Sequence, residues 1–396
     1  MKVLQINAVC GVGSTGRIVT DIANSLNLQG HDTLICFSRG EAEQWDHIYR
    51  VNSKFDMRLH GLKVRLFDKC GFGSKGATRR LCEKITEYNP DVIHLHNIHG
   101  YFINLKYLFR FLKQYNKPIV WTFHDCWAFT GHCAYFDLVG CDKWKTGCFK
   151  CANKKEYPRS ILFDRSKKNY LEKKKYFSGV RNMTIVTPSQ WLANLVKQSF
   201  LKEYSVLVIN NGIDISAFKQ TQSNFRQKYS LENKKIVLGV ASEWTRRKGL
   251  ADFVKLSGLL SDEYRIVLVG LSDKQFKRIP QNILGIKRLV LSVQELAGLY
   301  STADVFVNPT YEDNFPTTNL EAQACGTNVI TYKTGGSVES VCIDNVCEQG
   351  NIEMLYEMIK RESKKKKQPV IDAKGLDKEN MMREYLTLYD NLIAKK

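Results

Sequence analysis

Short apolar runs alternate with helical patterns along most of the chain, and this alternation constrains the fold more than any other feature. Runs rich in Val and Ile are typical of strands buried on both faces. They lie at 3–6, 33–37, 92–95, 119–123, 184–187 and 206–209 in the first half, and at 235–241, 265–270, 305–307 and 328–331 in the second. Strands that alternate with helices predict parallel sheets covered by helices, as in doubly wound α/β domains.

The chain length and a turn-rich connector predict two such domains. A chain of 396 residues, 43% of them hydrophobic, is long enough to bury two cores. The connector, residues 210–214, lies between two strand patterns and contains Gly212. We therefore expect one α/β domain over residues 1–210 and a second that begins at residue 211 and extends to about residue 376.

A glycine-rich stretch at residues 11–17 follows the first predicted strand. We expect it to form a loop before a helix over residues 18–28. Glycines let the backbone approach a ligand closely, and a helix N-terminus offers N–H groups to an anion. The stretch matches neither a Walker A motif nor a complete dinucleotide fingerprint. The candidate ligand contacts in it are Gly13, Ser14, Thr15 and Gly16.

Polar side chains follow two further strand patterns of the first half. His96 and Asn97 come directly after the run 92–95, and His124 and Asp125 come after the run 119–123. Ligands of doubly wound sheets bind beyond the carboxyl ends of the strands, so we expect these side chains to converge on one site. A purely structural role for the histidines explains the pattern equally well.

In the second half, Asp313 and Glu321 flank a predicted strand-to-helix turn. An apolar run ends at Pro309, and a helix is expected from Thr317. The unpaired N–H groups of its first turn suit a diphosphate. A capped surface helix with acids near its start is the alternative. The candidate ligand contacts in this turn are Asn314, Phe315, Pro316, Thr317 and Thr318.

Three cations follow the run 235–241 of the same predicted sheet. They are Arg246, Arg247 and Lys248, and cations just beyond a strand end are well placed to bind phosphates. The strand before Asp313 belongs to the same sheet, so acids and cations are expected on one side of it.

The net charge of +19 is concentrated in two segments of the first half. Residues 54–80 and 141–181 supply (8−2)+(13−4) = 15 of the excess positive charge. Within the first segment, Phe55, Leu59, Leu62 and Leu66 recur at helical spacing among basic residues. This pattern fits a helix on an anionic membrane surface, and equally a core-packed helix with a solvated basic face. We see no nucleic-acid-binding motif and expect no nucleic-acid partner.

Targeting signals are not evident. No apolar run approaches the 18 or so residues that a membrane-spanning helix needs, and residues 1–7 predict a first strand rather than a signal peptide. We therefore expect a cytoplasmic protein whose twelve cysteines are reduced.

A cysteine-rich stretch follows Asp125. Cys133, Cys141, Cys148 and Cys151 are separated by seven, six and two residues. The last spacing is common in structural zinc sites, and a loop with few apolar residues benefits from a metal. We expect a structural zinc site at these four cysteines. Unligated thiols, or two disulfides in an oxidising compartment, fit the same spacing.

Taken together, these stretches resemble family 4 glycosyltransferases of the GT-B type, in particular those that build bacterial capsular and exopolysaccharides. The resemblance rests on residues 11–17, 90–97, 122–125, 211–214, 247–249 and 313–326, in the family's order. It implies two Rossmann-like domains that face a central cleft, the first binding the acceptor and the second the nucleotide sugar. It also implies that a final helix in residues 377–396, roughly 378–394, crosses back to the first domain.

The resemblance assigns roles to five residues. Lys248 is similar to the lysine that binds the donor diphosphate, and Arg247 assists it. Glu321 resembles the acid that holds the nucleotide ribose, and Asp313 the acid that contacts the donor sugar. His124 resembles the histidine that orients the sugar or stabilises charge near the reacting centre. The family retains anomeric configuration without an established protein nucleophile, so none is assigned.

Three positions depart from the family pattern. Ser242 and Glu243 stand where the family commonly has Gly-Arg, so the usual diphosphate arginine is missing. The first acid is Asp313 with Glu312 beside it, and either can face the donor. Asn314 replaces a common glycine.

The expected function is retaining transfer of a sugar from a nucleotide-diphosphate sugar to a polyprenyl-diphosphate-linked saccharide. The enzyme would act peripherally on the inner, anionic face of the cytoplasmic membrane, in cell-surface polysaccharide synthesis. No metal or other cofactor is expected to be required for catalysis, since cations and helix dipoles can balance the diphosphate charge. A noncatalytic scaffold of the same fold in a polysaccharide assembly complex is the alternative, and the missing arginine favours it.

Overall fold

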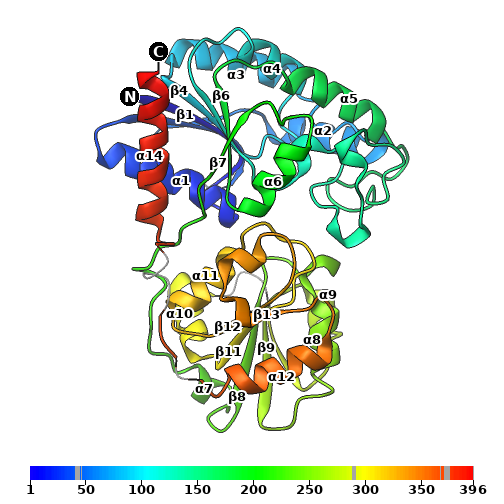
Figure 1. Cartoon of the computed structure of the whole chain (residues 1–396), viewed down its shortest axis with the longest axis vertical. Helices are drawn as coiled ribbons and strands as arrows, with labels where there is room; N and C mark the ends of the chain where they lie inside the picture. The colour runs from blue at the N-terminus through cyan, green and yellow to red at the C-terminus, as the bar shows by residue number, and fades with distance from the viewer. Residues whose placement is uncertain (41–44, 46, 288–290, 366, 370–374, 396) are drawn as a thin grey trace. The chain divides into compact units, whose positions relative to one another are not determined.

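The computed structural model describes residues 1–40, 45, 47–287, 291–365, 367–369 and 375–395 (Figure 1). The chain forms two compact units. The first contains Met1–Asn210 together with Met382–Lys396, and the second contains Asn211–Met381. Each unit is built on a parallel sheet, so the predicted pair of doubly wound α/β units is confirmed.

The first unit contains a seven-stranded sheet in the order β3-β2-β1-β4-β5-β6-β7. Its strands are β1 (Lys2–Cys10), β2 (Asp32–Gly40), β3 (Ile48–Arg50), β4 (Val92–Leu95), β5 (Ile119–Thr122), β6 (Met183–Thr187) and β7 (Ser205–Val208). β1 pairs with both β2 and β4. The strand order therefore reverses at β1, and at such a switch point doubly wound sheets open a crevice for ligands.

Helices cover both faces of this sheet. They are α1 (Gly13–Leu28), α2 (Lys54–Phe67), α3 (Lys75–Tyr88), α4 (Leu105–Leu112), α5 (Ser166–Phe177) and α6 (Gln190–Gln198). Successive residues of a strand point to opposite faces. Thus Leu34 and Cys36 of β2 join the core cluster that includes residues of α3 and α4, whereas Ile35 and Phe37 pack with Val19 of α1.

Helix α1 begins earlier than predicted. It starts at Gly13, whereas the glycine-rich stretch was expected to remain a loop as far as residue 17. Glycine, serine and threonine have low helix propensity, which favoured the loop. The first turn nevertheless forms as part of a helix whose buried side chains, including Ile18, Val19 and Ile22, pack in the core.

The second unit contains a six-stranded sheet in the order β10-β9-β8-β11-β12-β13. Its strands are β8 (Lys235–Val240), β9 (Tyr264–Leu271), β10 (Ile283–Lys287), β11 (Val305–Asn308), β12 (Val329–Tyr332) and β13 (Val346–Cys347). Its helices are α7 (Phe225–Lys228), α8 (Leu250–Leu256), α9 (Asp273–Phe276), α10 (Val293–Thr302), α11 (Thr317–Ala324) and α12 (Ile352–Glu362).

Alternation along the strands again divides the core of the second unit into two layers. Leu238 and Phe306 pack with residues of α10 and α11. Val237 and Val305 pack with residues of α8 and α12 on the other face. Strands β3, β10 and β13, all at sheet edges, were not predicted, because β3 and β13 have only three and two residues and Gly285 interrupts the apolar run of β10.

The last helix, α14 (Lys378–Ala394), begins in the second unit and continues in the first, where it lies beside α1 (Figure 1). Its Tyr385 and Tyr389 are buried and reach residues of β4 and β5. The predicted return of the final helix to the first domain is confirmed. Residue 396, the end of the expected segment, lies outside the described residues.

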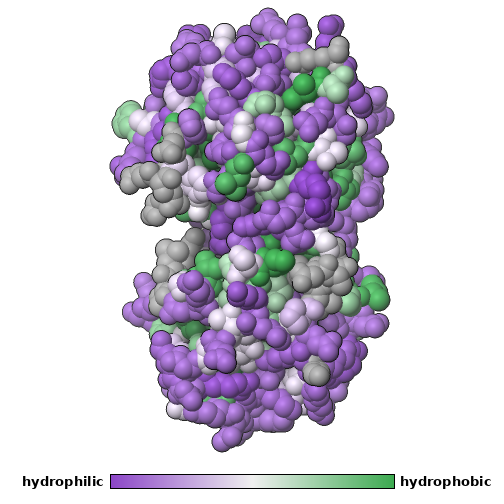
Figure 2. All heavy atoms as spheres, turned by 90° about the vertical axis from the view of Figure 1, so that its left-hand side faces the viewer, coloured by the Kyte–Doolittle hydropathy of each residue, from purple (hydrophilic) through white to green (hydrophobic). Residues whose placement is uncertain are grey.

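Figure 2 shows a face on which hydrophilic residues predominate and apolar residues form small, separate groups. Among the described residues, no helix is both long enough and apolar enough to cross a membrane.

Candidate functional site

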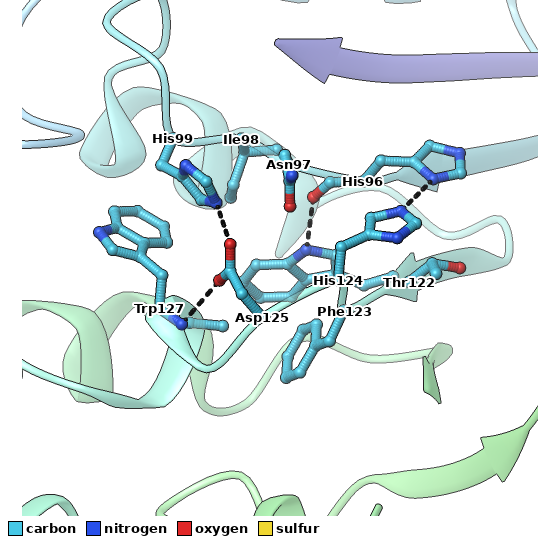
Figure 3. A pocket seen from close by; sticks show the side chains of 11 residues that line it. His96, Asn97, Ile98, His99, Thr122, Phe123, His124, Asp125 and Trp127 are labelled. Atoms are coloured by element: carbon cyan, nitrogen blue, oxygen red, sulfur yellow. Dashed lines mark hydrogen bonds and ion pairs between the residues drawn. The ribbon is translucent and has the colours of Figure 1, made fainter. Parts of the chain in front are cut away.

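The first unit has a small pocket at the carboxyl ends of β4 and β5 (Figure 3). The predicted residues His96, Asn97, His124 and Asp125 all line it. The pocket lies where the strand-end rule places a ligand site in a doubly wound sheet. Its other lining residues are Ile98, His99, Trp121, Thr122, Phe123, Trp127 and Ala128.

Asp125 is fixed on one side of this pocket by two hydrogen bonds. Its Oδ2 lies 3.0 Å from Nε2 of His99, and its Oδ1 accepts a 2.8 Å bond from the backbone N–H of Trp127. Nδ1 of His99 lies 2.9 Å from the hydroxyl of Tyr157. Burial alone would raise the pKa of Asp125, but His99 and these hydrogen bonds outweigh it, so the pKa is below its ordinary value.

His124 stands at the end of a hydrogen-bonded chain on the other side. Its Nε2 lies 3.2 Å from Nδ1 of His96, whose Nε2 lies 3.1 Å from Oε1 of Gln5. Gln5 donates its amide to the carbonyl of Val19 at 2.9 Å, which leaves Oε1 to accept. His96 therefore donates through Nε2 and accepts through Nδ1, and His124 donates to it through Nε2.

Both histidines of this chain are held neutral. Burial lowers the pKa of His124 to about 4, and burial together with the neighbouring imidazoles lowers the pKa of His96 well below its ordinary value. A neutral imidazole has one donor and one acceptor nitrogen, which the chain from Gln5 requires.

Helix α14 packs against β4 and β5, the strands that precede these histidines. The hydroxyl of Tyr389 lies 2.7 Å from Nδ1 of His94, and Nε2 of His94 lies 2.8 Å from Oγ1 of Thr122. Tyr385 reaches the same Thr122 hydroxyl at 3.0 Å. The centroids of the His94 and His96 rings lie 3.9 Å apart, so the C-terminal helix contacts His94, which packs on His96.

The glycine-rich residues Gly13, Ser14, Thr15 and Gly16 form the first turn of α1 and do not line the pocket. One side chain connects this turn to the pocket. Asn7 donates its amide to the Thr15 carbonyl at 3.4 Å and accepts a 3.1 Å bond from the backbone N–H of Asn97. The two predicted parts of the acceptor site are thus joined through β1.

In the second unit, Lys248 and Asp313 form an ion pair. Lys248 lies in a one-turn helix after β8, and Asp313 follows β11, the neighbouring strand. Both side chains are largely buried, with exposures of 20% and 12%. Gly249 adopts φ 73°, and a Cβ there would lie 2.1 Å from the carbonyl oxygen of Pro309. Glycine therefore lets the two strand ends approach.

The pKa values of this pair record a balance between burial and charge. Burial lowers the pKa of Lys248, although Asp313 opposes the shift. Burial would raise the pKa of Asp313, but the charges of Lys248 and Arg247 outweigh it and hold this pKa below its ordinary value.

The two adjacent acids have different surroundings. The carboxylate of Asp313 contacts Lys248, and its Oδ1 accepts a 3.0 Å bond from the backbone N–H of Asn314. Glu312 accepts a 2.7 Å bond from Arg247 through its main-chain carbonyl. Asp313, rather than Glu312, is therefore the carboxylate on the predicted diphosphate lysine.

Helix α11 starts at Thr317, the predicted residue, and Pro316 precedes it without a side-chain cap. Phe315 is buried in the core of the unit. Glu321 is nearly buried, and its Oε2 accepts a 3.0 Å bond from the hydroxyl of Tyr300. The turn and the first helical residues thus follow Asp313 directly in the sequence and belong to the same unit as the Lys248–Asp313 pair.

Several residues of these sites were not predicted from the sequence. Gln5 and Asn7 could have been identified, because two side-chain amides are rare in a buried strand and need hydrogen-bond partners there. Tyr300, Tyr385 and Tyr389 gave none, since each reaches its partner from a helix far away in the sequence.

The four predicted zinc ligands, Cys133, Cys141, Cys148 and Cys151, line one small cavity in the loop that follows Asp125. All four are free thiols. Within the part of the chain that the structure describes, no three His, Cys, Asp or Glu side chains form a ready-made metal site.

Two protein-family models match the chain. Residues 15–217, just over half of it, match the model described as Glycosyltransferase Family 4. Residues 221–374 match the model described as Glycosyl transferases group 1.

Curated relatives include the putative colanic acid biosynthesis glycosyl transferase WcaC of Escherichia coli (strain K12). It is 28% identical over 230 residues, covering 54% of this chain and 55% of WcaC. The N,N'-diacetylbacillosaminyl-diphospho-undecaprenol alpha-1,3-N-acetylgalactosaminyltransferase of Campylobacter jejuni is 27% identical over 221 residues, covering 51% of this chain and 58% of that enzyme. The matches thus span little more than half the length of these relatives.

Solved structures share the fold over the whole chain. Sucrose-phosphate synthase from Thermosynechococcus elongatus superposes with a TM-score of 0.73 at 16% identity, covering 100% of both chains. Anabaena Alr3699/HepE in complex with UDP-glucose has a TM-score of 0.70 at 14% identity, covering 99% of this chain and 100% of that chain. At such identities the likeness shows the fold alone, and it confirms the predicted GT-B fold.

Proposed function

Since this chain belongs to glycosyltransferase family 4, we propose that it transfers a sugar, with retention of configuration, from a nucleotide-diphosphate sugar to a lipid-linked saccharide in cell-surface polysaccharide synthesis. The observation that carries the proposal is the buried Lys248–Asp313 pair, which joins the segments that follow β8 and β11, the second of which leads into α11. The chemistry of transfer requires groups of this kind, because the nucleotide leaves as an anion.

In this proposal the donor diphosphate binds Lys248, Arg247 and the N–H groups at the start of α11. Burial lowers the pKa of Lys248, so an added phosphate charge favours its charged form. The guanidinium of Arg247, which now contacts the Glu312 carbonyl, supplies the charge of the arginine missing at Glu243. Helix N-termini favour anions through their N–H groups and dipole.

Glu321 is proposed to hold the hydroxyls of the nucleotide ribose. A carboxylate accepts two hydroxyl protons, and Tyr300 fixes its orientation through Oε2. Asp313 is proposed to contact the donor sugar while it remains paired with Lys248.

His124 is proposed to orient the sugar or to stabilise charge near the reacting centre. Its imidazole is neutral and its orientation is set through His96 and Gln5. Asp125, Asn97 and the α1 turn are the proposed acceptor contacts of the first unit. We assign no residue as a nucleophile.

The surface of α2 supports action at an anionic membrane, where a lipid-linked acceptor would lie. Phe55, Leu59 and Leu62 are 75%, 41% and 52% exposed, and the helix buries only His60 and Val64. Leu66, the last member of the stripe, is half-buried, and the helix packs on the first unit through His60 and Val64.

A second segment adds to the same surface. The backbone N–H of Ile161 donates to the Arg65 carbonyl at 2.7 Å, and Phe163 stacks on Phe67 with 5.7 Å between ring centroids. Ile161 and Phe163 are 53% and 54% exposed. Exposed apolar side chains among lysines and arginines suit the surface of an anionic bilayer, to which we propose the enzyme binds peripherally from the cytoplasm.

A turnover screen tests the proposed function. The full chain would be incubated with a panel of nucleotide-diphosphate sugars, and the released nucleotide measured for wild type, Lys248→Ala and Glu321→Ala. We expect one donor to be hydrolysed and both variants to lose most of the turnover. Equal turnover in all three proteins would contradict the assigned site. Failure to bind any nucleotide sugar, with retained binding to partner enzymes, would favour a noncatalytic scaffold.

A further inference from the structure

The cavity in the cysteine-rich loop is lined by side chains of the kinds that bind metals. Besides Cys133, Cys141, Cys148 and Cys151, it is lined by His132. Thiolate and imidazole groups are the ligands that zinc prefers, and a structural zinc site takes four of them in a tetrahedron.

His132 has the surroundings of a metal-binding imidazole. Its Nδ1 lies 2.6 Å from Oδ1 of Asp68, and both side chains are fully buried. The other oxygen of Asp68 accepts a 2.8 Å bond from the backbone N–H of Arg165. A carboxylate that accepts from one ring nitrogen directs the lone pair of the other towards a metal, as is usual at histidine ligands.

The second ring nitrogen of His132 has no hydrogen-bond partner although it is buried. A buried polar atom without a partner is costly, and an ion that is not part of the structure is one of the few explanations for it. This buried nitrogen faces the residues of the cysteine-lined cavity, which points to a metal as its partner.

Three of the thiols lie close together beside this imidazole. The side chains of Cys133 and Cys151 lie within reach of each other. The backbone N–H of Gly131 donates to Sγ of Cys148 at 3.2 Å. A Cβ at position 131 would lie 2.6 Å from Cβ of Cys148, so glycine lets the chain approach this sulfur.

From this geometry we infer that the loop binds one zinc ion through the thiolates of Cys133, Cys148 and Cys151 and through Nε2 of His132. Binding releases the thiol protons to solvent. Because these side chains do not yet form a ready-made site, they must rotate between staggered positions to close on the ion. A tetrahedral ion takes four ligands, and Cys141, which lines the cavity but is not among the thiols near Cys133, stays outside the ligand set.

The ion would fix the loop to the rest of the first unit. Asp68 is the residue at the C-terminal end of α2, so the Asp68–His132 pair connects that helix to the loop. The loop also contains Trp127, which lines the pocket beside Asp125. All four positions on the ion are filled, so its role is structural. The inference does not depend on the proposed sugar transfer.

Metal content tests the inference directly. The full chain would be purified under reducing conditions from cells supplied with zinc, and its zinc measured by plasma emission. We expect about one equivalent in wild type and a loss of nearly all of it in Cys148→Ser/Cys151→Ser. Cys82→Ser is the matched control, since Cys82 is also a half-buried free thiol but lies on α3, and it should keep the ion.

Two further variants test the ligand set. Asp68→Asn should weaken zinc binding roughly 10- to 100-fold, as loss of a supporting carboxylate does at other sites. Cys141→Ser should keep the ion and His132→Gln should lose affinity, both measured by competition with a chelating dye. Zinc that is lost in Cys141→Ser and kept in His132→Gln would overturn the assignment of His132.

Wild type alone provides a test that does not depend on the folding of any variant. A chelator should remove the ion and lower the unfolding temperature, and added zinc should restore it. Wild-type chain that takes up no zinc while its thiols react as free would overturn the inference. A disulfide between Cys133 and Cys151 in the protein as purified would overturn it as well.

Discussion

The two units place functional side chains at the same kind of position, the carboxyl edge of a parallel sheet, but they stabilise them by different physics. In the first unit the side chains are neutral imidazoles that hydrogen-bond in series from Gln5 to His124. In the second unit the central feature is the charged Lys248–Asp313 pair. All eight histidines of the chain lie in residues 1–210. Because histidines titrate in mild acid, we expect mild acid to perturb the first site and to leave the second intact.

The largest effect is expected from the charged pair. Lys248→Ala removes a cation from the developing phosphate charge and leaves Asp313 buried without its partner. Turnover should fall by about 10²- to 10³-fold, the usual effect of losing one group that stabilises transition-state charge. The control is Lys333→Ala. Its pair with Glu348 is exposed and should contribute about 0–1 kcal/mol to stability, and its loss should leave turnover unchanged. A similar, small loss of turnover in both variants would contradict the expected difference between the two pairs.

The next largest effect is expected from acid, which should lower the stability of the first unit more than that of the second. The pKa of His124 in the folded chain is about 4, below its unfolded value near 6.5. The unfolded chain therefore binds more protons between these values, and stability falls as pH drops from about 6.5 to about 4. The gap corresponds to about 3 kcal/mol, at about 1.4 kcal/mol per pKa unit. The pKa of Asp313 is lowered, so its contribution persists until pH falls below about 4.

Urea unfolding at several pH values measures this difference. The first unit, followed by the fluorescence of its tryptophans, should lose stability on going from pH 7 to pH 5, and His124→Gln should lose part of that dependence. If both units unfolded together over the same pH range, in wild type and in His124→Gln alike, the expected difference in pH dependence between the units would be contradicted.

Gln5, the first residue of the hydrogen-bonded histidine chain, provides a third test. Gln5→Leu removes the acceptor that makes His96 donate through Nε2, and it leaves a buried nitrogen without a partner. We expect a loss of about 1–3 kcal/mol in unfolding free energy. Nitrogen-15 NMR of the imidazoles should show His96 and His124 changing from single tautomers to mixtures. Unchanged imidazole shifts in a folded variant would exclude Gln5 as the residue that sets the tautomers.

The smallest effect is expected at the C-terminal helix. Tyr389→Phe removes the hydroxyl that lies 2.7 Å from His94, a change of about 1 kcal/mol in unfolding free energy. Tyr107→Phe is the control, because the Tyr107 hydroxyl accepts a long, 3.4 Å hydrogen bond from Arg79 at the surface, and its loss should change little. Equal effects would show that α14 does not support the histidine chain.

The sequence predicted the central strands of both sheets because they are continuous apolar runs, and β4 matches its predicted limits, 92–95. It did not predict the edge strands β3, β10 and β13, because β3 and β13 are very short and a glycine interrupts the apolar run of β10. Nor did it predict which face of α2 is buried, since Val64 and His60 give a weaker pattern than the exposed leucines.

The same limits apply to the sites. Strand-end residues such as His96, His124 and Asp125 could be predicted to converge, because parallel strands end at one edge. The choice between Asp313 and Glu312 could not, since adjacent side chains in a turn diverge in ways that spacing does not record. The partner of Lys248 became evident only from the contact itself.

We propose above all that the second unit binds a nucleotide-diphosphate sugar through Lys248 and Glu321. Calorimetric titration of the full chain with a panel of these donors tests it most directly. We expect at least one donor to bind with one site per chain, and Lys248→Ala and Glu321→Ala each to weaken its binding while Lys333→Ala does not. Binding of the same strength in all four proteins, or binding of no donor to wild type, would contradict it.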